Sequence, residues 1–517
     1  MRTSNQIVKC ILGNERKRLP IKLIDSFEVK TKADRYFITK KLAQVPFFVR
    51  IEVRNEFNRM AKSKNISLKG AKVFLKQLAI FCSDLPVNVT ITIKQLHMHI
   101  SEIVQLCTKY KKNFKKGSIS NFDLLKKIEK LIALMGLSPR KGKSLFGDIN
   151  RYCSPKWWSR KLKCLYLQSK ERVAHYLRLV NDKLDKYLTS ENFDILRENR
   201  ARNQVYFDSL VATDELDTKL NFSDVVSSSL ANPKNRKAEI VTRLKGSEKY
   251  AEKYGYKSDL ITFTCPSKYH AVSHPNIKNA NYDNSSIWEA KEYLTKQWAR
   301  IRTKLQKLNV DYYGFRVVEP HHDGTPHWHL IIFSKENQRQ CLHDCIQNHI
   351  VKGATHKQHL LDIKPVDKKK GSAEGYLVKN ITEKVDFTGK KNIPSSEELS
   401  RINEWGTLWK VHQFEPFGGP KAGMWREARR IAMTAQVDDS PIWKIVKGGD
   451  WLAFFEFTNQ PKVDGSKSKI SLYKKFDDSL NEFGEERGIL VKGLIIDDKV
   501  YFSRQKKWEI NVKSGHF

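Results

Sequence analysis

Two apolar, β-rich runs on either side of a turn-forming pentapeptide constrain the fold of this chain more than any other part of it. The runs are YYGFRVVEP (312–320) and PHWHLIIF (326–333), and the peptide between them is HHDGT. Asp-Gly between two such runs is a strong signal for a β-hairpin. The sequence therefore predicts a pair of antiparallel strands here, with four histidines beside the turn.

Strand and helix patterns alternate around this hairpin. DLITFTCPSKYH (259–270) and LLDIKPVD (360–367) are typical of strands, and residues 287–308 and 372–385 of helices. The first helix presents one apolar stripe, made of Ile287, Leu294, Trp298, Ile301, Leu305 and Leu308. A sheet must bury its apolar face against another layer, so we expect an α+β fold with a central antiparallel sheet flanked by helices.

The 517 residues are too many for one ordinary domain, and the pattern changes twice along the chain. In residues 1–225, apolar residues recur every three or four positions among many Lys and Arg. We therefore expect a basic helical region there, which either contacts DNA or is merely solvated. Residues 226–435 hold the predicted sheet and form the expected catalytic domain. In 436–517, WLAFFEFTNQPKVDGSKSKISLYKKF (451–476) and the segment 488–513 predict short strands, hence a small β-rich domain without an assigned role.

Charge and cysteine content narrow the class of protein. Lys and Arg number 94 and Asp and Glu 57, a net charge of +37 that favours a polyanionic partner. The eight cysteines contain no CxxC pair, which fits reduced thiols. No run of eighteen apolar residues and no signal-peptide pattern is present, so we expect a soluble, unexported protein. One amphipathic helix explains the spacing of Cys341, His343, Cys345 and His349 better than a metal site does.

The hairpin suggests a metal site on one of its faces. Side chains alternate along a strand, so His327 and His329 share a face. Glu319 lies opposite His327 in a symmetric hairpin and opposite His329 in a register shifted by two. Either register brings two imidazoles and a carboxylate together, which suits one divalent ion with positions left for a substrate. The alternative is a pair of surface histidines on an edge strand. His321, His322 and Asp323 lie in the turn, where they either assist or are solvated.

The helix at 372–385 offers a nucleophile. Tyr376, Lys379 and Asn380 are spaced i, i+3, i+4 and share one helical face. A phenol attacks a phosphate only when its pKa is lowered or the phosphate is polarised, and Lys379 and a metal ion could provide these effects. The alternative is that Tyr376 packs and Lys379 is solvated.

At these residues the sequence resembles the HUH endonucleases, named for His-hydrophobic-His, here His327-Trp328-His329. It resembles most closely the gene A replication endonucleases of tailed temperate phages and prophages. The segments that carry this resemblance are SSSLANPKNRKAEIVTRLKG, LITFTCPSKYH, EPHHDGTPHWHLIIF, AEGYLVKNI and WGTLWKVHQFEPFGGPKAGMWRE, with CSPKWWSRKLK as a weaker extension.

The resemblance implies a site-specific nick in single-stranded DNA at a phage origin. A tyrosine becomes bonded to the 5′-phosphate, and the free 3′-OH primes rolling-circle synthesis. By position, Tyr376 is the nucleophile with Lys379 beside it, and His327, His329 and Glu319 bind Mg²⁺ or Mn²⁺. The resemblance also implies a host helicase and polymerase as partners, in the cytoplasm of a bacterial host cell.

One position departs from the family pattern. Members often carry two tyrosines four residues apart, whereas the second position here is Asn380. Asn380 in place of a second tyrosine puts a two-tyrosine cycle in doubt, but it does not affect the first cleavage. Two other classes stay open: a transposase or relaxase with the same residues, and a DNA-binding regulator without catalytic activity.

Overall fold

The chain divides into two compact units in the computed structural model. The first comprises Met1–Leu179 with Asp477–Gly488, and the second Val180–Phe476 with Ile489–Phe517. The structure describes residues 21–115, 120–135, 137–140, 142, 144–273, 277–350, 360–366, 375, 384–385, 391–392, 396–434, 437–460, 469–504 and 506–513. These units differ from the three segments expected from the sequence, which stay a prediction about the domains.

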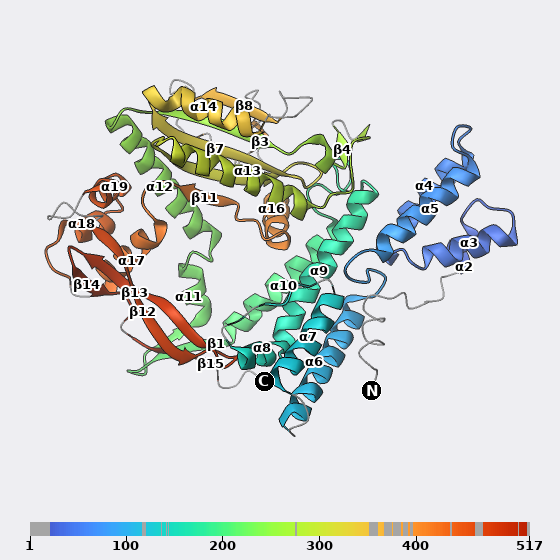
Figure 1. Ribbon diagram of the computed structural model, residues 1–517, viewed down its shortest axis with the longest axis horizontal. Coiled ribbons are helices and arrows are strands. Elements are labelled where there is room, and N and C mark those ends of the chain that lie inside the picture. The colour runs from blue at the N-terminus through green and yellow to red at the C-terminus, as the bar shows by residue number, and fades with distance from the viewer. Residues whose placement is uncertain are drawn as a thin grey trace. The chain divides into compact units, whose positions relative to one another are not determined.

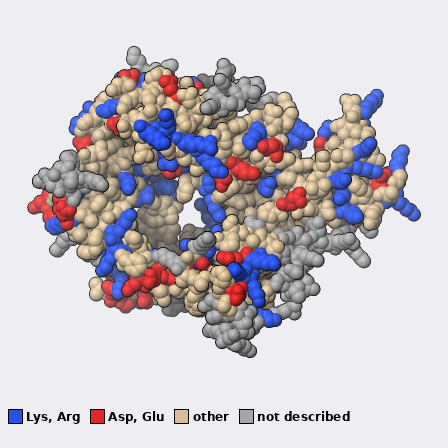
Figure 2. All heavy atoms as spheres, in the orientation of Figure 1, with Lys and Arg blue, Asp and Glu red and all other residues tan. Residues whose placement is uncertain are grey.

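The described N-terminal part of the first unit, up to Leu179, is built from helices, as expected for the N-terminal region (Figure 1). Apolar residues every three or four positions bury one side of each helix, with Val53 and Phe57 of α4 and Leu75 and Leu78 of α5 among the buried side chains. Lys and Arg side chains form several patches on the surface of α3 to α5 (Figure 2). The elements are α2 (Ile21–Asp25), α3 (Lys32–Leu42), η1 (Phe47–Val49), α4 (Arg50–Lys62), α5 (Ser67–Ser83), α6 (Ile93–Lys115), α7 (Asn121–Leu134), α8 (Leu145–Tyr152) and α9 (Pro155–Tyr176).

The second unit contains a five-stranded antiparallel sheet, in the order β11-β6-β7-β3-β8. Its strands are β3 (Tyr256–Thr264), β6 (Tyr312–Pro320), β7 (Pro326–Lys335), β8 (Leu361–Pro365) and β11 (Phe414–Phe417). The hairpin predicted around HHDGT is confirmed as β6 and β7, and the strands predicted at 259–270 and 360–367 as β3 and β8. The α+β fold class is therefore confirmed.

Helices α13 (Ile287–Lys307) and α14 (Glu336–Ile350) cover one face of this sheet (Figure 1). The ring of Trp298 lies 6.1 Å from that of Phe263 on β3. The predicted stripe of α13 is buried except at Leu308, which is 42% exposed because the helix ends at Lys307. That part of the prediction was wrong.

The opposite face is covered by α12 (Pro233–Lys253), α17 (Ala422–Thr434), α18 (Pro441–Lys447) and α19 (Trp451–Asn459), with one apolar core between the layers. Tyr250 of α12 stacks on Phe455 of α19 with ring centroids 3.9 Å apart. The prediction of a strand over WLAFFEFTN was wrong, because Asp450 caps α19 by accepting a hydrogen bond from the Ala453 amide. Trp451, Phe454 and Phe455 then lie on one buried helical face.

The remaining elements lie outside the five-stranded sheet and the helices that cover its two faces. They are α10 (Ser190–Asp208), β1 (Leu210–Asp214), β2 (Lys219–Asn221), α11 (Phe222–Ser228), η2 (Ser267–Tyr269), β4 (Val272–Ser273), β5 (Ile277–Lys278), β9 (Lys384–Val385), β10 (Lys391–Asn392), α16 (Ser396–Leu408), β12 (Ile470–Leu480), β13 (Glu486–Ile496), β14 (Lys499–Phe502) and β15 (Trp508–Val512). The last four strands confirm the β-rich character expected for the C-terminal region. None of the helices in the described part of the chain combines the length and apolar composition needed to cross a bilayer.

Candidate active site in the β6–β7 hairpin

The turn between β6 and β7 is closed by backbone hydrogen bonds. The His321 amide donates to the Thr325 carbonyl and the Gly324 amide to the His321 carbonyl, each at 2.8 Å. Gly324 has a φ of +81°, a left-handed conformation that a residue without Cβ adopts at little cost. The indole of Trp405 on α16 donates to the Gly324 carbonyl. The turn is therefore fixed both within itself and from α16.

The strand register brings the predicted face together. Glu319 pairs with His327 across the hairpin, which is the symmetric register of the two that the sequence allowed. On the other side of β7, His329 pairs with Thr262 of β3. Glu319, His327 and His329 thus lie on one face of the sheet, beyond the end of the apolar core that Ile331 and Phe333 form on the same face of β7.

Three imidazoles pack at this position. The ring centroids of His327 and His329 are 4.5 Å apart, and those of His327 and His321 are 4.4 Å apart. His327 Nδ1 lies 2.5 Å from His321 Nε2, and His329 Nδ1 lies 3.2 Å from the hydroxyl oxygen of Thr262. Contacts of this kind fix the orientation of an imidazole ring.

Two buried polar atoms in the cluster lack a hydrogen-bond partner among the described residues: Nε2 of His327 and Oε1 of Glu319. Burial raises the pKa of Glu319 to about 8. Burial, followed by the effect of His321, lowers the pKa of His329 to about 3. Burial, followed by a neighbouring imidazole, also lowers the pKa of His321 and His327. The imidazoles are therefore neutral near pH 7, the form that donates a lone pair to a metal.

A buried aspartate and a histidine from another segment support the turn. Asp323 is completely buried, and its carboxylate lies 3.1 Å from His270 Nδ1 and accepts the Thr325 amide. Burial opposes ionisation of Asp323, but His270 outweighs it and holds the pKa of this carboxyl below its usual range. The His270 ring contacts that of His321, with centroids 5.1 Å apart. His322 instead faces Asp182, with 3.8 Å between Nδ1 and Oδ2.

His270 was missed in the sequence, where it lies about fifty residues before the turn and follows a proline-stopped strand. Only the pairing of β3 with β7 brings its segment to the hairpin. The sequence left the three turn residues open, and the structure distinguishes them. His321 contacts His327, Asp323 is buried with His270, and His322 lies beside Asp182.

The donor set fits a divalent cation in its chemistry. Two neutral imidazoles and a carboxylate are common ligands, and a cation would satisfy the unpartnered atoms of His327 and Glu319 while reversing the high pKa of that carboxyl. Among the residues that the structure describes, no three His, Cys, Asp or Glu side chains are already arranged to hold a metal ion. The metal site therefore stays a proposal based on the donor set. Tyr376, Lys379 and Asn380 lie outside the described residues.

Comparison with known proteins defines the class to which this fold and hairpin belong. Residues 104–388, more than half of the chain, match the family model "Bacteriophage replication gene A protein (GPA)". The matched range includes all of the hairpin and the segment with Tyr376. The chain therefore belongs to the family of bacteriophage replication gene A proteins.

Curated relatives agree with this assignment. "Probable replication protein P12" of Pseudoalteromonas phage PM2 is 32% identical over 389 residues, covering 71% of this chain and 60% of the relative. "Replication gene A protein" of Escherichia phage 186 is 28% identical, covering 65% and 51%. "Probable replication endonuclease from prophage-like region" of Shigella boydii serotype 4 is 29% identical, covering 55% and 37%. The chain thus spans at most 60% of the length of these relatives. No solved structure matches it.

Proposed function

We propose that this protein is a site-specific endonuclease that nicks single-stranded DNA at a phage replication origin. The observation that carries the proposal is the face of the hairpin where Glu319, His327 and His329 lie together, with one buried atom on each of the first two that has no hydrogen-bond partner among the described residues. Membership of the gene A family and the word "endonuclease" in the name of a relative support it. The charge of +37 suits a nucleic-acid substrate.

In this proposal His327, His329 and Glu319 hold Mg²⁺ or Mn²⁺. The bound ion would supply positive charge at the scissile phosphate. Thr262 and His321 keep the two imidazoles oriented, because each lies within hydrogen-bonding distance of a ring nitrogen. Asp323 and His270 stabilise the turn that carries His321. The histidine face of the hairpin would therefore position a phosphate without using its own residues as the nucleophile.

Tyr376 is the proposed nucleophile. Its phenolic oxygen forms a bond to phosphorus and loses its proton, while the bond from phosphorus to the 3′ oxygen breaks and that oxygen takes up a proton. The products are a 5′-phosphotyrosine and a free 3′-OH, and the number of phosphate ester bonds is unchanged. Lys379 neutralises charge on the phosphate. The 3′-OH then primes rolling-circle synthesis by a host helicase and polymerase.

The test is an incubation of the full chain with labelled single-stranded origin-region DNA and Mn²⁺, followed by a denaturing gel. We expect a covalent adduct, and Tyr376→Phe should remove it because the ring stays and the hydroxyl is lost. Protease digestion and mass spectrometry should place the nucleotide on the Tyr376 peptide. An adduct on another peptide, or an undiminished adduct from the variant, would overturn the assignment of the nucleophile.

The same gel separates the alternatives. Binding that is seen only under native conditions would indicate a DNA-binding regulator without catalytic activity. An adduct that forms on transposon ends or a transfer origin, and not on a replication origin, would indicate a transposase or relaxase. If origin DNA is recovered bonded to a second tyrosine near Tyr376 as well, a two-tyrosine cycle would be restored despite Asn380.

A further inference from the structure

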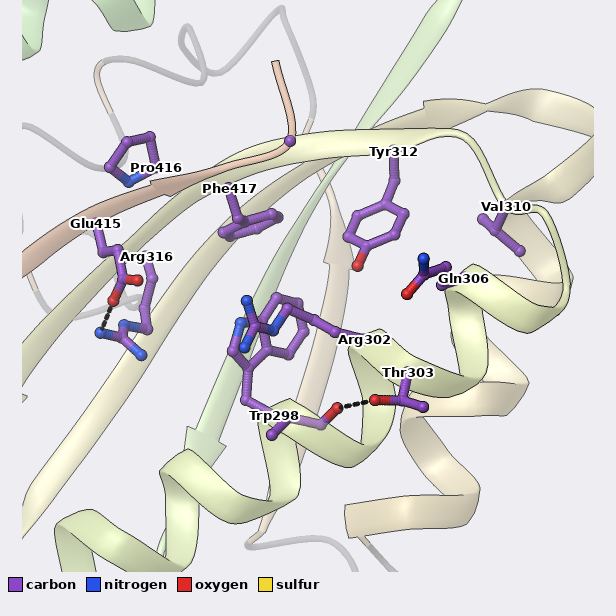
Figure 3. Close-up of a pocket in the computed structure, with 12 residues that line it drawn as sticks. Trp298, Arg302, Thr303, Gln306, Val310, Tyr312, Arg316, Glu415, Pro416 and Phe417 are labelled. Carbon is purple, nitrogen blue, oxygen red and sulfur yellow. Dashed lines mark hydrogen bonds and ion pairs between the residues drawn. The ribbon is translucent and has the colours of Figure 1, made fainter. Parts of the chain in front are cut away.

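A cavity of about 620 Å³ lies on the face of the sheet opposite the histidines, between α13 and the strands β6 and β11 (Figure 3). Tyr312 and Arg316 of β6 point into it, whereas Glu319 of the same strand faces the histidine cluster, because side chains alternate along a strand. Its volume falls within the range of about 300–1,000 Å³ that is usual for ligand sites. Every lining residue belongs to the second unit and is described.

Aromatic rings form two sides of this cavity. Figure 3 shows Tyr312 and Phe417 on the strands and Trp298 on α13 below them. The Phe417 ring centroid is 5.0 Å from that of Trp298 and 6.1 Å from that of Tyr312. Tyr312 and Phe417 are only partly buried, so their rings can accept a flat ligand.

Two guanidinium groups lie beside the rings with a single carboxylate. Arg316 is 9% exposed, lies over the Trp328 ring and pairs with Glu415, yet its Nε has no partner in the described part of the chain. Arg302 is exposed and makes no hydrogen bond or ion pair with any described residue. The cavity therefore has one positive charge in excess, which suits an anion.

We propose that this cavity binds one nucleotide, with its base against Tyr312 and Phe417 and its phosphate at Arg302. A neutral aromatic ligand would form no ion pair with the Arg302 guanidinium, and inorganic phosphate would not stack on the aromatic rings. Base stacking on aromatic side chains combined with arginine is the usual chemistry of single-strand binding. The site goes beyond the proposed function, because it uses the other face of the sheet and needs neither Tyr376 nor a metal.

The first experiment compares two arginines of α13. Arg302→Ala and Arg300→Ala remove the same charge from exposed positions two residues apart, which lie on opposite sides of the helix. Binding of a labelled single-stranded oligonucleotide is measured with chelator present, so that no cleavage contributes. We expect about a tenfold loss of affinity for Arg302→Ala and less than a twofold loss for Arg300→Ala. Equal losses would mean that only net charge matters and would overturn the proposal.

The second experiment locates the base. The full chain is irradiated with 5-iododeoxyuridine monophosphate in one arm and with an oligonucleotide containing 5-iododeoxyuridine in the other, and the adduct is mapped by mass spectrometry. A crosslink to Tyr312, Phe417 or Trp298 in the first arm indicates that the cavity binds a free nucleotide. A crosslink to these residues in the second arm alone indicates that it binds a nucleotide within a DNA strand. Both support the pocket. Crosslinks confined to other peptides in both arms would overturn it.

A third measurement separates stacking from general packing. Phe417→Leu keeps an apolar side chain against Trp298 but removes the ring face, so the fold should persist, as far-ultraviolet circular dichroism can check. We expect oligonucleotide affinity to fall about tenfold. Unchanged affinity, or equal affinity of wild type for oligonucleotides with and without bases, would show that no base enters the cavity. Failure here would leave the proposed cleavage untouched, since that is read from the Tyr376 adduct.

Discussion

The two faces of the β6–β7 hairpin differ in the kind of side chain that they bury. On one face, His327, His329 and Glu319 form a polar cluster in which two buried atoms have no hydrogen-bond partner among the described residues. On the other face, Trp328 is buried beneath the Arg316 guanidinium, whose carbon lies 4.0 Å from the ring centroid. Neighbouring residues of one strand thus enter different environments: imidazoles and a carboxylate gather on one face, whereas an indole and a guanidinium pack together on the other.

The difference suggests a division of roles between the faces. Buried polar atoms without a partner among the described residues occur on both faces, but on the histidine face they are a ring nitrogen and a carboxylate oxygen, which a cation could satisfy. The opposite face gains free energy from aromatic packing and carries the cavity with Arg302. We infer that the hairpin stabilises itself through one face and presents its chemistry on the other.

The largest expected effect is on stability and comes from the aromatic face. Trp328→Ala removes a side chain that is 2% exposed, and we expect the free energy of unfolding to fall by about 3–5 kcal/mol. Urea denaturation followed by circular dichroism measures it. Trp328→Phe keeps part of the packing and should cost less. If Trp328→Ala is no less stable than wild type, the packing role of this face is wrong.

The next effect concerns the polar face. His327→Ala or His329→Ala should lower the rate of DNA cleavage about a hundredfold to a thousandfold, because charge at the phosphate is lost. DNA affinity should change less than threefold. His412→Ala is the matched control, since His412 is exposed and outside the cluster. Cleavage at the wild-type rate in either variant, or in wild type with chelator, would contradict the metal assignment.

These two faces were predictable from the sequence because the signal is local. Alternation around HHDGT placed His327 and His329 on one side and Trp328 on the other, and the turn limited the register to two choices. His270 was beyond such reasoning, because its approach to His321 depends on how β3 pairs with β7. The cavity with Arg302 was not predictable either, because its lining comes together only when α13 packs against β6 and β11.

The same limit explains the wrong prediction at α19. WLAFFEFTN is apolar at nearly every position, so a short strand and a short buried helix give the same pattern. Asp450 decides in favour of the helix through its cap, and packing against α12 completes the choice. Short apolar runs need their capping residue to be considered before a strand is assigned.

A smaller effect concerns the pH dependence of stability, which should differ between the metal-free and metal-bound states of the polar face. The pKa of Glu319 is raised by burial from 4.5 to about 8, so the folded chain holds a proton that the unfolded chain releases. Stability of the chelated protein should therefore decline as pH rises from about 4.5 to about 8. Glu319→Gln cannot ionise, and at pH 8 it should be more stable than wild type by about 1–3 kcal/mol.

Thermal or urea unfolding at both ends of this pH range provides the measurement. Near pH 4.5 the variant and the wild type should be about equally stable, because the wild-type carboxyl is then neutral in the folded chain. Added Mn²⁺ should stabilise the wild type more than the variant, since a carboxylate is a stronger ligand than an amide oxygen. The same pH dependence in both proteins would show that Glu319 is not desolvated.

The smallest effect is on the salt dependence of binding, and it compares the two faces directly. Each phosphate contact made by a cation lowers the slope of log affinity against log salt by about 0.7 for single strands. Arg302→Ala should therefore make the slope shallower by about this amount, while Arg300→Ala should leave it unchanged. His327→Ala should also leave it unchanged, because burial lowers the pKa of this imidazole and it carries no charge near pH 7. A shallower slope for His327→Ala, measured with chelator, would mean that the His327 imidazole is charged when DNA binds. The distinction between a neutral metal-ligand face and a cationic DNA-binding face would then be wrong.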